Sequence, residues 1–294
     1  MSALLQISDP HFGTVRPEVA QALLALHRAT QPELVVLSGD ITQRGRRSQF
    51  AEARAFFDQL AAPALLALPG NHDIPLFNPL LRLFLPYANY ARAFGSDLAP
   101  AFESPSLLVI GVNTTRRLRH VDGEVSGTQV ERVAQRLRRA TSLQLRIVVT
   151  HQPVHVIREQ DEENLLHGHE VAVRAWSEAG ADVIMGGHIH LPYVSLMADR
   201  HSGLHRRIWA VQAGTALSTR VRRSAPNSVN ILRYAGALPQ TCAVERWDFD
   251  AVSAAFQRAE VTLLDLDRRT ASSPATLSDN HAAATAQPAR TSLK

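Results

Sequence analysis

The sequence predicts a single-domain α/β fold, and three observations support that prediction. The chain has 294 residues, enough for one domain with a large buried core. Short apolar runs, typical of buried strands, alternate with longer stretches in which apolar residues recur at helical spacing. Apolar residues make up 45% and charged residues 20% of the chain, as in folded globular proteins and unlike disordered or fibrous ones.

The first part of the chain predicts three strands separated by two helices. Residues 4–8, 34–37 and 64–68 are short, mainly apolar runs, and the last two are apolar throughout, as expected of strands covered on both faces. Residues 16–30 and 48–60 carry apolar side chains at helical spacing, which predicts helices with one buried face. This alternation of strands and helices is typical of an α/β fold.

Residues 75–100 interrupt the alternation. The segment is rich in proline and aromatic residues, and we expect a long loop or short helices lying over a site. Its aromatic side chains would then form a lid, a homodimer contact or a cover for the protein's own core. These side chains are Phe77, Phe84, Tyr87, Tyr90 and Phe94.

The following part of the chain predicts more strands and two more helices. Strands are expected at residues 107–112, 145–150, 181–185, 207–213, 230–234 and 241–248, the last two as an antiparallel pair. Helices are expected at residues 128–139 and 170–178, the first with a capping box formed by Thr128 and Glu131. We find no linker that would divide this part, so residues 1–265 are predicted to form one domain.

The end of the chain has a different composition. Of the 25 residues from 270 to 294, 15 are Ala, Ser or Thr, and only Leu277 and Leu293 are large apolar residues that could anchor a core. Residues 266–294 are therefore predicted to be a disordered tail.

Composition also restricts the compartment and the partners. Cys242 is the only cysteine, which excludes an intramolecular disulfide and favours a cytoplasmic location. The apolar run at residues 60–69 is shorter than the roughly 18 residues that span a membrane, and residues 1–8 lack the features of a secretory signal. The 31 basic and 27 acidic residues give a net charge of +4, which does not favour a nucleic-acid partner.

Polar residues follow five of the predicted strands. In chain order the motifs are Asp-x-His, Gly-Asp, Gly-Asn-His-Asp, a lone His and Gly-His-x-His. In an open α/β sheet, ligands bind in the crevice beyond the carboxyl ends of the strands, so we expect these motifs to meet at one edge. Their side chains able to bind metal are Asp9, His11, Asp40, Asn71, His151, His188 and His190.

The chemistry of these seven side chains predicts a dinuclear metal site. Carboxylate, imidazole and amide groups form a mixed nitrogen and oxygen set that suits Fe, Mn, Zn or Co, and the absence of cysteine disfavours a structural zinc site. Seven ligands are too many for one tetrahedral ion. They suit two divalent ions about 3.5–4 Å apart that share a carboxylate.

The order of the motifs resembles that of the calcineurin-like metallophosphoesterases over roughly residues 4–193. This resemblance implies a four-layer αββα sandwich of two mixed β-sheets flanked by helices. It implies that Fe or Mn is the favoured metal, with Zn and Co as alternatives. The implied ligands are Asp9, His11, Asp40 and His190 for one ion, and Asp40, Asn71, His151 and His188 for the other, so that Asp40 bridges the two.

The resemblance also implies a reaction. Two divalent ions that share a water lower its pKa, and the resulting hydroxide attacks the phosphorus of the substrate in line with the leaving group. The resemblance places His72 away from the metals and facing the substrate, where it would protonate the leaving group as a general acid. Asp73, the next residue, is expected to orient His72.

The substrate suggested by the resemblance is a small phosphodiester. Histidine rather than arginine or cysteine after Gly-Asn, together with the segments 214–218 and 226–230, is similar to bacterial class III cyclic-nucleotide phosphodiesterases. A cyclic nucleotide such as 3′,5′-cyclic AMP is therefore the expected substrate. Glycerophosphodiesters, 2′,3′-cyclic nucleotides and phosphomonoesters are alternatives.

Two further alternatives keep the fold and change the role. A nuclease of the same superfamily would need a broad basic groove, for which a net charge of +4 gives little support. A non-enzymatic scaffold of this fold would normally have lost part of the ligand set, whereas every ligand position is filled here. A phosphodiesterase is therefore preferred to both.

The remaining histidines and arginines carry weaker signals. His167 and His169 could form a third metal site, but a solvated turn is the preferred interpretation, and His155 could line a pocket. We expect Trp176 in the core. The histidines expected at the surface are His27, His120, His201, His205 and His281. Two arginine clusters are interpreted as exposed loops, with phosphate contact as the alternative: Arg116, Arg117 and Arg119, and Arg220, Arg222 and Arg223.

Overall fold

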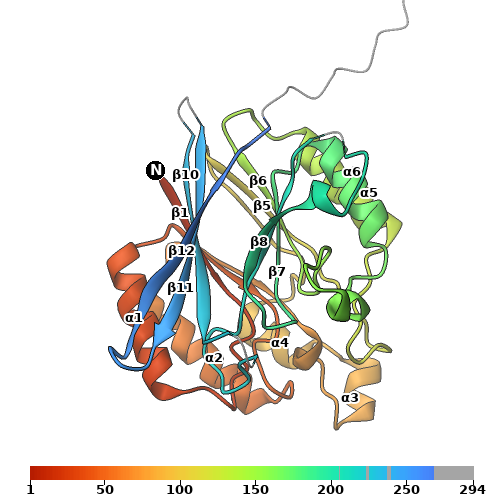
Figure 1. Cartoon of the computed structure of the whole chain (residues 1–294). Helices are drawn as coiled ribbons and strands as arrows, with labels where there is room; N and C mark the ends of the chain where they lie inside the picture. The colour runs from red at the N-terminus through yellow and green to blue at the C-terminus, as the bar shows by residue number, and fades with distance from the viewer. Residues whose placement is uncertain (205, 223–224, 237–239, 268–294) are drawn as a thin grey trace, which may run out of the picture.

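The computed structural model describes residues 1–204, 206–222, 225–236 and 240–267. These residues form two six-stranded sheets that face each other, with helices on the outer side of each sheet (Figure 1). Both sheets contain parallel and antiparallel pairs. The predicted αββα sandwich of two mixed sheets is confirmed.

The first sheet is built on a parallel unit. β1 (Ser2–Ile7), β2 (Leu34–Ser38) and β3 (Leu65–Leu68) lie side by side in this order and run parallel. α1 (Pro17–Thr30) and α2 (Arg47–Leu60) connect these strands and pack their apolar faces on the outer side of the sheet. The predicted strands and helices are all present, with small shifts at their ends.

An antiparallel meander completes the first sheet. β10 (Ser228–Ala235) pairs with β1, β11 (Thr241–Asp250) pairs with β10, and β12 (Ala255–Leu264) forms the edge. The predicted antiparallel pair corresponds to β10 and β11. β12 was not predicted, because most of its side chains are exposed and its sequence therefore has no apolar pattern.

The second sheet has the strand order β4-β5-β6-β7-β9-β8, in which the four central strands are parallel and both edges are antiparallel. Its strands are β4 (Ala101–Glu103), β5 (Leu107–Gly111), β6 (Leu145–Val149), β7 (Val183–Gly186), β8 (Tyr193–Leu196) and β9 (Trp209–Gln212). The short edge strands β4 and β8 were not predicted. α5 (Gly127–Arg138) and α6 (His169–Ala179) pack on the outer face, where Trp176 is fully buried as predicted.

The capping box of α5 differs from the prediction. Ser126 is the N-cap, and its Oγ accepts a hydrogen bond from the backbone N–H of Gln129. The side chain of Gln129 in turn accepts a hydrogen bond from the backbone N–H of Ser126. The prediction of Thr128 and Glu131 was wrong because Ser-x-x-Gln, which starts two residues earlier, fits the same motif.

The segment at residues 75–100 forms two short helices, α3 (Pro79–Phe84) and α4 (Ala88–Phe94). α4 packs on α2, and the hydroxyl of the buried Tyr90 donates to the carbonyl oxygen of Ala67. α3 buries none of its residues. The segment therefore covers the core through α4 and extends away from it through α3 (Figure 1).

Three apolar clusters fill the spaces between the four layers. One lies between α1, α2 and the first sheet, and another lies between α5, α6 and the second sheet. The third consists of side chains from both sheets, such as Leu34 and Val36 from β2 and Ile147 and Val149 from β6. Because each central strand is covered on both faces, its residues are apolar on both sides.

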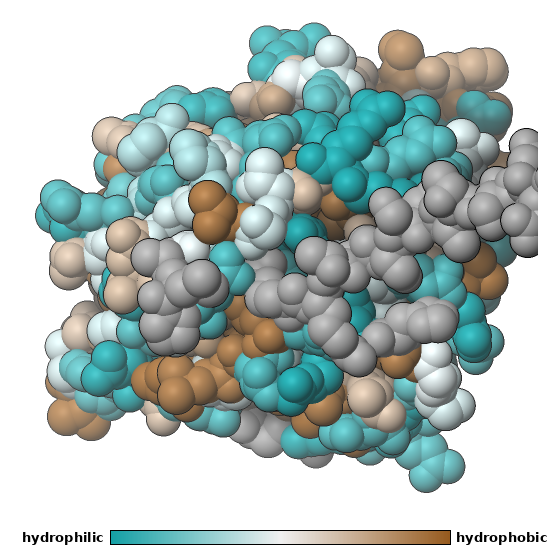
Figure 2. Space-filling model, turned by 90° about the horizontal axis from the view of Figure 1, so that it is seen from above, coloured by the Kyte–Doolittle hydropathy of each residue, from teal (hydrophilic) through white to brown (hydrophobic). Residues whose placement is uncertain are grey.

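The connecting loops place polar residues at one end of the sandwich. The loops include 3₁₀ helices η1 (Asn71–Asp73) and η2 (Glu159–Asn164), which follow the parallel strands β3 and β6, whereas η3 (Met197–Asp199) follows the antiparallel strand β8. Figure 2 views the molecule from the end at which β1 begins, where hydrophilic residues are interspersed with smaller hydrophobic groups. The parallel strands run away from this face, so their carboxyl ends and the loops that follow them lie at the other end.

Two further predictions concern membrane-spanning segments and the end of the chain. No helix among the described residues is long and apolar enough to cross a membrane. The tail predicted for residues 266–294 lies outside the described residues from 268 onward, so the tail and the domain boundary at residue 265 stay predictions.

Candidate metal centre

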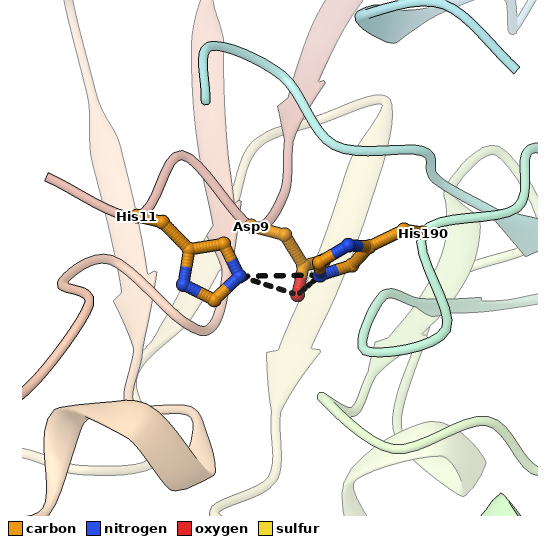
Figure 3. A group of neighbouring side chains, drawn as sticks. All are labelled: Asp9, His11 and His190. Carbon is orange, nitrogen blue, oxygen red and sulfur yellow. Dashed lines mark hydrogen bonds and ion pairs between the residues drawn. The ribbon is translucent and has the colours of Figure 1, made fainter. Parts of the chain in front are cut away.

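The structure brings the seven predicted ligands together at the end of the sandwich where parallel strands of both sheets finish. Among the described residues, two groups of side chains have ligand atoms close enough to hold a metal ion. Asp9, His11 and His190 form the first group, and Figure 3 shows their side chains pointing toward one another from two loops. Asp40, His151 and His188 form the second.

In the first group, three ligand atoms surround one point. The Nε2 atoms of His11 and His190 are 3.1 Å apart. The Oδ1 atom of Asp9 lies 3.3 Å from Nε2 of His190 and 3.9 Å from Nε2 of His11. Two imidazole nitrogens and a carboxylate oxygen at these separations can bind one transition-metal ion.

The second group also combines imidazole nitrogens with a carboxylate oxygen, and the predicted amide ligand lies beside them. Nε2 of His151 lies 3.2 Å from Oδ1 of Asp40 and 3.2 Å from Oδ1 of Asn71. Nδ1 of His188 lies 3.1 Å from the same amide oxygen of Asn71. Asn71 thus joins this group through a neutral oxygen, as its place in the predicted ligand set requires.

Asp40 lies between the two groups. Its Oδ1 faces His151 of the second group, and its Oδ2 lies 3.8 Å from Nε2 of His11 in the first. The side chain is almost fully buried, at 2% exposure. This position is the one expected of a carboxylate shared by two ions.

Several of these ligand atoms have lone pairs that no donor in the described part of the chain uses, as expected of groups that bind a metal ion. Oδ1 of Asp9 is buried and accepts no hydrogen bond from any described residue. Two of the imidazoles are oriented by backbone carbonyls: Nδ1–H of His151 donates to Ser38 at 2.8 Å, and Nδ1–H of His190 donates to Arg220 at 2.6 Å. These hydrogen bonds leave each Nε2 lone pair free, which is the usual arrangement of a metal-binding histidine.

Five of the predicted ligands have a left-handed backbone, which is uncommon for residues other than glycine. Their φ angles are 50° for Asp9, 45° for His11, 48° for Asp40, 72° for His188 and 55° for His190. Such conformations persist where the surrounding structure enforces them, and they concentrate at functional sites. The turns therefore aim the side chains inward at a cost in conformational energy.

Close packing around the site also explains one glycine of the motifs. Gly39 has a φ of 102°, and a Cβ there would lie 2.3 Å from Nδ1 of His151. Only glycine leaves room for the imidazole at this point.

Comparison with known proteins agrees with this geometry. The family model of the calcineurin-like phosphoesterases matches residues 3–192. The chain belongs to this family. A protein of Synechococcus sp. called a probable cyclic nucleotide phosphodiesterase is 24% identical over 202 residues, which cover 65% of this chain and 74% of that protein.

Solved structures of phosphatases share the fold. A dimetal phosphatase from Danio rerio superposes with a TM-score of 0.62 at 14% identity, covering 90% of this chain and 99% of that one. A purple acid phosphatase from yellow lupin seeds has a TM-score of 0.62 at 12% identity, covering 89% of this chain and 53% of that one. At these identities the likeness concerns the fold alone.

The electrostatics of this site differ from one imidazole ligand to the next: the pKa values of His11 and His188 are lowered, and those of His151 and His190 are raised. Burial lowers the pKa of His11 to about 3 and that of His188 to about 4, so both are neutral at pH 7. Burial opposes ionisation of Asp9, but the neighbouring His190 outweighs it and lowers the pKa of Asp9 to about 2. Burial alone would lower the pKa of His151, whereas Asp40 beside it raises that pKa to about 9.

Metal binding is therefore expected to release a proton. Without metal, His151 is protonated below its pKa of about 9, and it must lose that proton to bind an ion through Nε2. The affinity for Mn²⁺ should rise as the pH is raised from 6 toward about 9 and level off above it. Calorimetric titration in two buffers of different ionisation enthalpy measures the protons released, to which His190, whose pKa Asp9 raises against the effect of burial, would also contribute. Equal heats in both buffers would contradict this expectation.

His72 lies at the edge of the two groups. Its side chain is 24% exposed, its Nε2 is 3.9 Å from Oδ2 of Asp40, and neither ligand group includes it. Its Nδ1–H donates to the carbonyl oxygen of Gln43 at 2.9 Å. His72 is thus placed beside the predicted metal site, with its Nε2 3.1 Å from Nη1 of Arg220.

The expected role of Asp73 is corrected by the structure. Its carboxylate is fully buried and accepts hydrogen bonds from the backbone N–H groups of Gly70, Ile41 and Thr42, and from the hydroxyl of Thr42. The prediction that Asp73 orients His72 was wrong, because Gln43 holds that imidazole instead. Asp73 joins the loops after β2 and β3, and burial together with Asp40 raises its pKa to about 7.

Replacing Asp73 should affect stability more directly than chemistry. In an Asp73→Asn variant the amide N–H₂ would face the backbone N–H donors that the carboxylate accepts. We expect a loss of about 2–4 kcal/mol in the free energy of unfolding, measured by urea denaturation. The exposed Asp58, changed to asparagine, is the control. A stability equal to that of the control would show that Asp73 does not hold these loops together.

A pocket of about 180 Å³ opens beside His72. Its lining combines apolar and aromatic side chains with polar ones. The lining residues are Gln43, Arg44, Asn71, His72, Ile74, Leu76, Phe77 and His120. The guanidinium carbon of Arg44 lies 5.2 Å from the centre of the Phe77 ring. The pocket therefore presents an aromatic face and a cation next to the predicted general acid.

The other histidines discussed above do not belong to the two ligand groups. Among the described residues, neither metal group includes His167 or His169. His155 is buried and lines a separate pocket with His169 and His201. The prediction that His27 is at the surface was wrong, because it is 6% exposed and follows Leu23 by one helical turn on the buried face of α1. His205 and His281 lie outside the described residues.

The two arginine clusters differ in what their side chains contact. Arg116 donates to Gln129 of the capping box, Arg117 donates to the carbonyl oxygen of Leu83, and Arg119 pairs with Glu124. These contacts agree with the interpretation as loop residues. Arg220, in contrast, reaches His72, while Arg223 lies outside the described residues. In the sequence Arg220 stands in a cluster of arginines with two possible roles, and no motif distinguishes it from its neighbours.

Proposed function

We propose that this chain hydrolyses small phosphodiesters with the help of two divalent metal ions, and that cyclic nucleotides such as 3′,5′-cyclic AMP are its substrates. The observation that carries the proposal is the pair of ligand groups joined by Asp40, with His72 beside them. The likeness to a probable cyclic nucleotide phosphodiesterase of Synechococcus sp. supports the choice of substrate.

The proposed ligands are those of the two groups. Asp9, His11, Asp40 and His190 would hold one ion, and Asp40, Asn71, His151 and His188 would hold the other. When bound, such a pair supplies a nucleophile at neutral pH and neutralises charge on the phosphoryl oxygens. Fe or Mn is the proposed metal, because the nitrogen and oxygen donors suit these ions.

His72 is proposed to complete the reaction as the proton donor. The alkoxide that leaves phosphorus needs a proton, and an imidazole can supply one near neutral pH. The hydrogen bond from Nδ1–H to Gln43 fixes the ring and directs Nε2 toward the substrate side. The Nε2 atom is therefore the atom from which the proton would pass to the leaving oxygen.

The pocket beside His72 favours a nucleotide over a glycerol ester. The ring of Phe77 offers a stacking surface for a planar base, and Arg44 lies over the same ring. A glycerophosphodiester has no aromatic group to use this surface. The base would thus lie on Phe77 while the phosphodiester faces the ligand groups.

A substrate panel tests the proposal. Protein reconstituted with Mn²⁺ would be assayed on 3′,5′-cyclic AMP, 3′,5′-cyclic GMP, 2′,3′-cyclic AMP, glycerophosphoethanolamine, nitrophenyl phosphate and single-stranded DNA. We expect the highest kcat/KM on a 3′,5′-cyclic nucleotide and no turnover after chelation. A higher kcat/KM on the monoester or on DNA would replace the proposal with a phosphomonoesterase or a nuclease.

Location and assembly complete the proposal. A cytoplasmic location is supported by Cys242, a buried free cysteine.

A homodimer is supported by exposed apolar side chains on and beside α3, where Phe77, Leu80 and Phe84 are each 70% exposed. Light scattering during size-exclusion chromatography would give the mass in solution, and a monomer would exclude the dimer.

A further inference from the structure

Arg220 contacts both the first ligand group and the predicted proton donor His72. Its carbonyl oxygen accepts the hydrogen bond from Nδ1–H of His190, a predicted ligand of the first group. Its guanidinium Nη1 lies 3.1 Å from Nε2 of His72 and 3.3 Å from Oε1 of Gln43. One residue therefore contacts a predicted metal ligand through its backbone and the predicted proton donor through its side chain.

The backbone around Arg220 is fixed. The N–H of Arg220 donates to Oγ of Ser218 at 3.2 Å, and Thr219 donates its N–H to the carbonyl oxygen of Thr14 at 3.0 Å. A β-bridge also joins Ser218 to Val15 in the loop after β1. The guanidinium is thus held on the substrate side of the site by an anchored chain.

The charge of this guanidinium is not balanced within the part of the chain that the structure describes. No carboxylate of the described residues lies within ion-pair distance of Arg220, which is half-buried. Its neighbour Arg222 pairs with Asp161 at 2.9 Å, and the buried Arg206 pairs with Asp182 at 3.0 Å. An anion bound beside His72 would supply the charge that Arg220 lacks.

We propose that Arg220 binds a non-bridging oxygen of the substrate's phosphoryl group. This inference rests on the proposed function, because the anion it names is the phosphodiester of that reaction. A guanidinium is always protonated and offers several N–H donors in one plane, so it can bind a phosphoryl oxygen once Nε2 of His72 carries the proton for the leaving group and no longer accepts from Arg220. Arg220 would then hold the phosphorus atom between the ligand groups and the proton donor.

Three variants test this role in the Mn²⁺-loaded protein. Arg220→Gln keeps the length of the side chain and removes the charge, Arg220→Lys keeps the charge and loses the planar fork, and the exposed Arg207→Gln is the control. For each we would measure metal content, kcat and KM on 3′,5′-cyclic AMP, and the affinity for inorganic phosphate by calorimetry.

Arg220→Gln should bind two ions and raise KM roughly ten- to a hundredfold, with a parallel loss of phosphate affinity and a smaller change in kcat. Arg220→Lys should recover part of both losses, and Arg207→Gln should match the unchanged protein. Unchanged KM and phosphate affinity in Arg220→Gln would overturn the proposal. Loss of metal from Arg220→Gln would also overturn it, because the residue would then act through His190.

The proposed function and this inference can fail separately. If the unchanged protein hydrolysed none of the phosphodiesters, the proposed function would be wrong. Weaker phosphate binding by Arg220→Gln would still support Arg220 as the residue that binds the anion. Full activity on 3′,5′-cyclic AMP in Arg220→Gln, with phosphate affinity unchanged, would leave the proposed function intact and remove Arg220 from it.

Discussion

An Asp40→Asn variant is expected to lose both metal ions and to lower kcat/KM by roughly a thousandfold or more. The two carboxylate oxygens of Asp40 face His151 at 3.2 Å and His11 at 3.8 Å, so one side chain serves both ligand groups. An amide has no negative charge to share and would turn N–H donors toward one of the ions. Elemental analysis by mass spectrometry and turnover of bis-nitrophenyl phosphate measure the two losses.

The control for Asp40→Asn is Asp58→Asn, which changes an exposed aspartate on α2 in the same way. It should keep two ions and full turnover. If Asp40→Asn retained two ions per chain, Asp40 would not be the shared ligand, and the two groups would have to bind metal independently.

A His72→Ala variant is expected to keep both ions and to lower kcat by roughly a hundred- to ten-thousandfold on substrates with alkoxide leaving groups. Neither ligand group includes His72, and its Nδ1–H is bound to Gln43, so the ring lies beside the metal ligands rather than among them. The loss should be much smaller with a nitrophenolate leaving group, which departs without a proton. Comparing 3′,5′-cyclic AMP with bis-nitrophenyl phosphate measures the difference.

The exposed His167 gives a matched control, since its change to alanine removes an imidazole far from both ligand groups. Two results would contradict the role of His72. One is the loss of a metal ion from His72→Ala, which would make it a ligand. The other is an equal loss on both substrates, which would exclude proton donation to the leaving group.

Much of the fold could be predicted because buried strands and amphipathic helices leave regular patterns. β2 and β6 are apolar on both faces because both sheets are covered, and α1 and α2 carry a single apolar stripe. β12 could not be found in this way, since it lies at an edge with most side chains in solvent. The N-cap of α5 was misplaced because two overlapping motifs fit and only the backbone geometry distinguishes them.

The residues that the structure gathers at the site were predictable for a similar reason, and their partners were not. Asp9, Asp40 and His151 each follow a strand, and parallel strands that end at one edge bring such residues together. The hydrogen bond between His72 and Gln43 and the contact of Arg220 with His72 join positions 29 and 148 residues apart in the chain. No local pattern encodes those pairs.

The left-handed turns at the metal-binding loops bear on how this protein could have evolved. Each costs about 1 kcal/mol or more in a residue with a Cβ, and glycine would adopt the same conformation freely. Drift toward glycine at Asp9, His11, Asp40, His188 and His190 would thus relieve this backbone strain. A chain kept only as an assembly platform would be free to follow that course. This chain carries acid and imidazole groups at all five positions, as expected where selection acts on catalysis at the expense of stability.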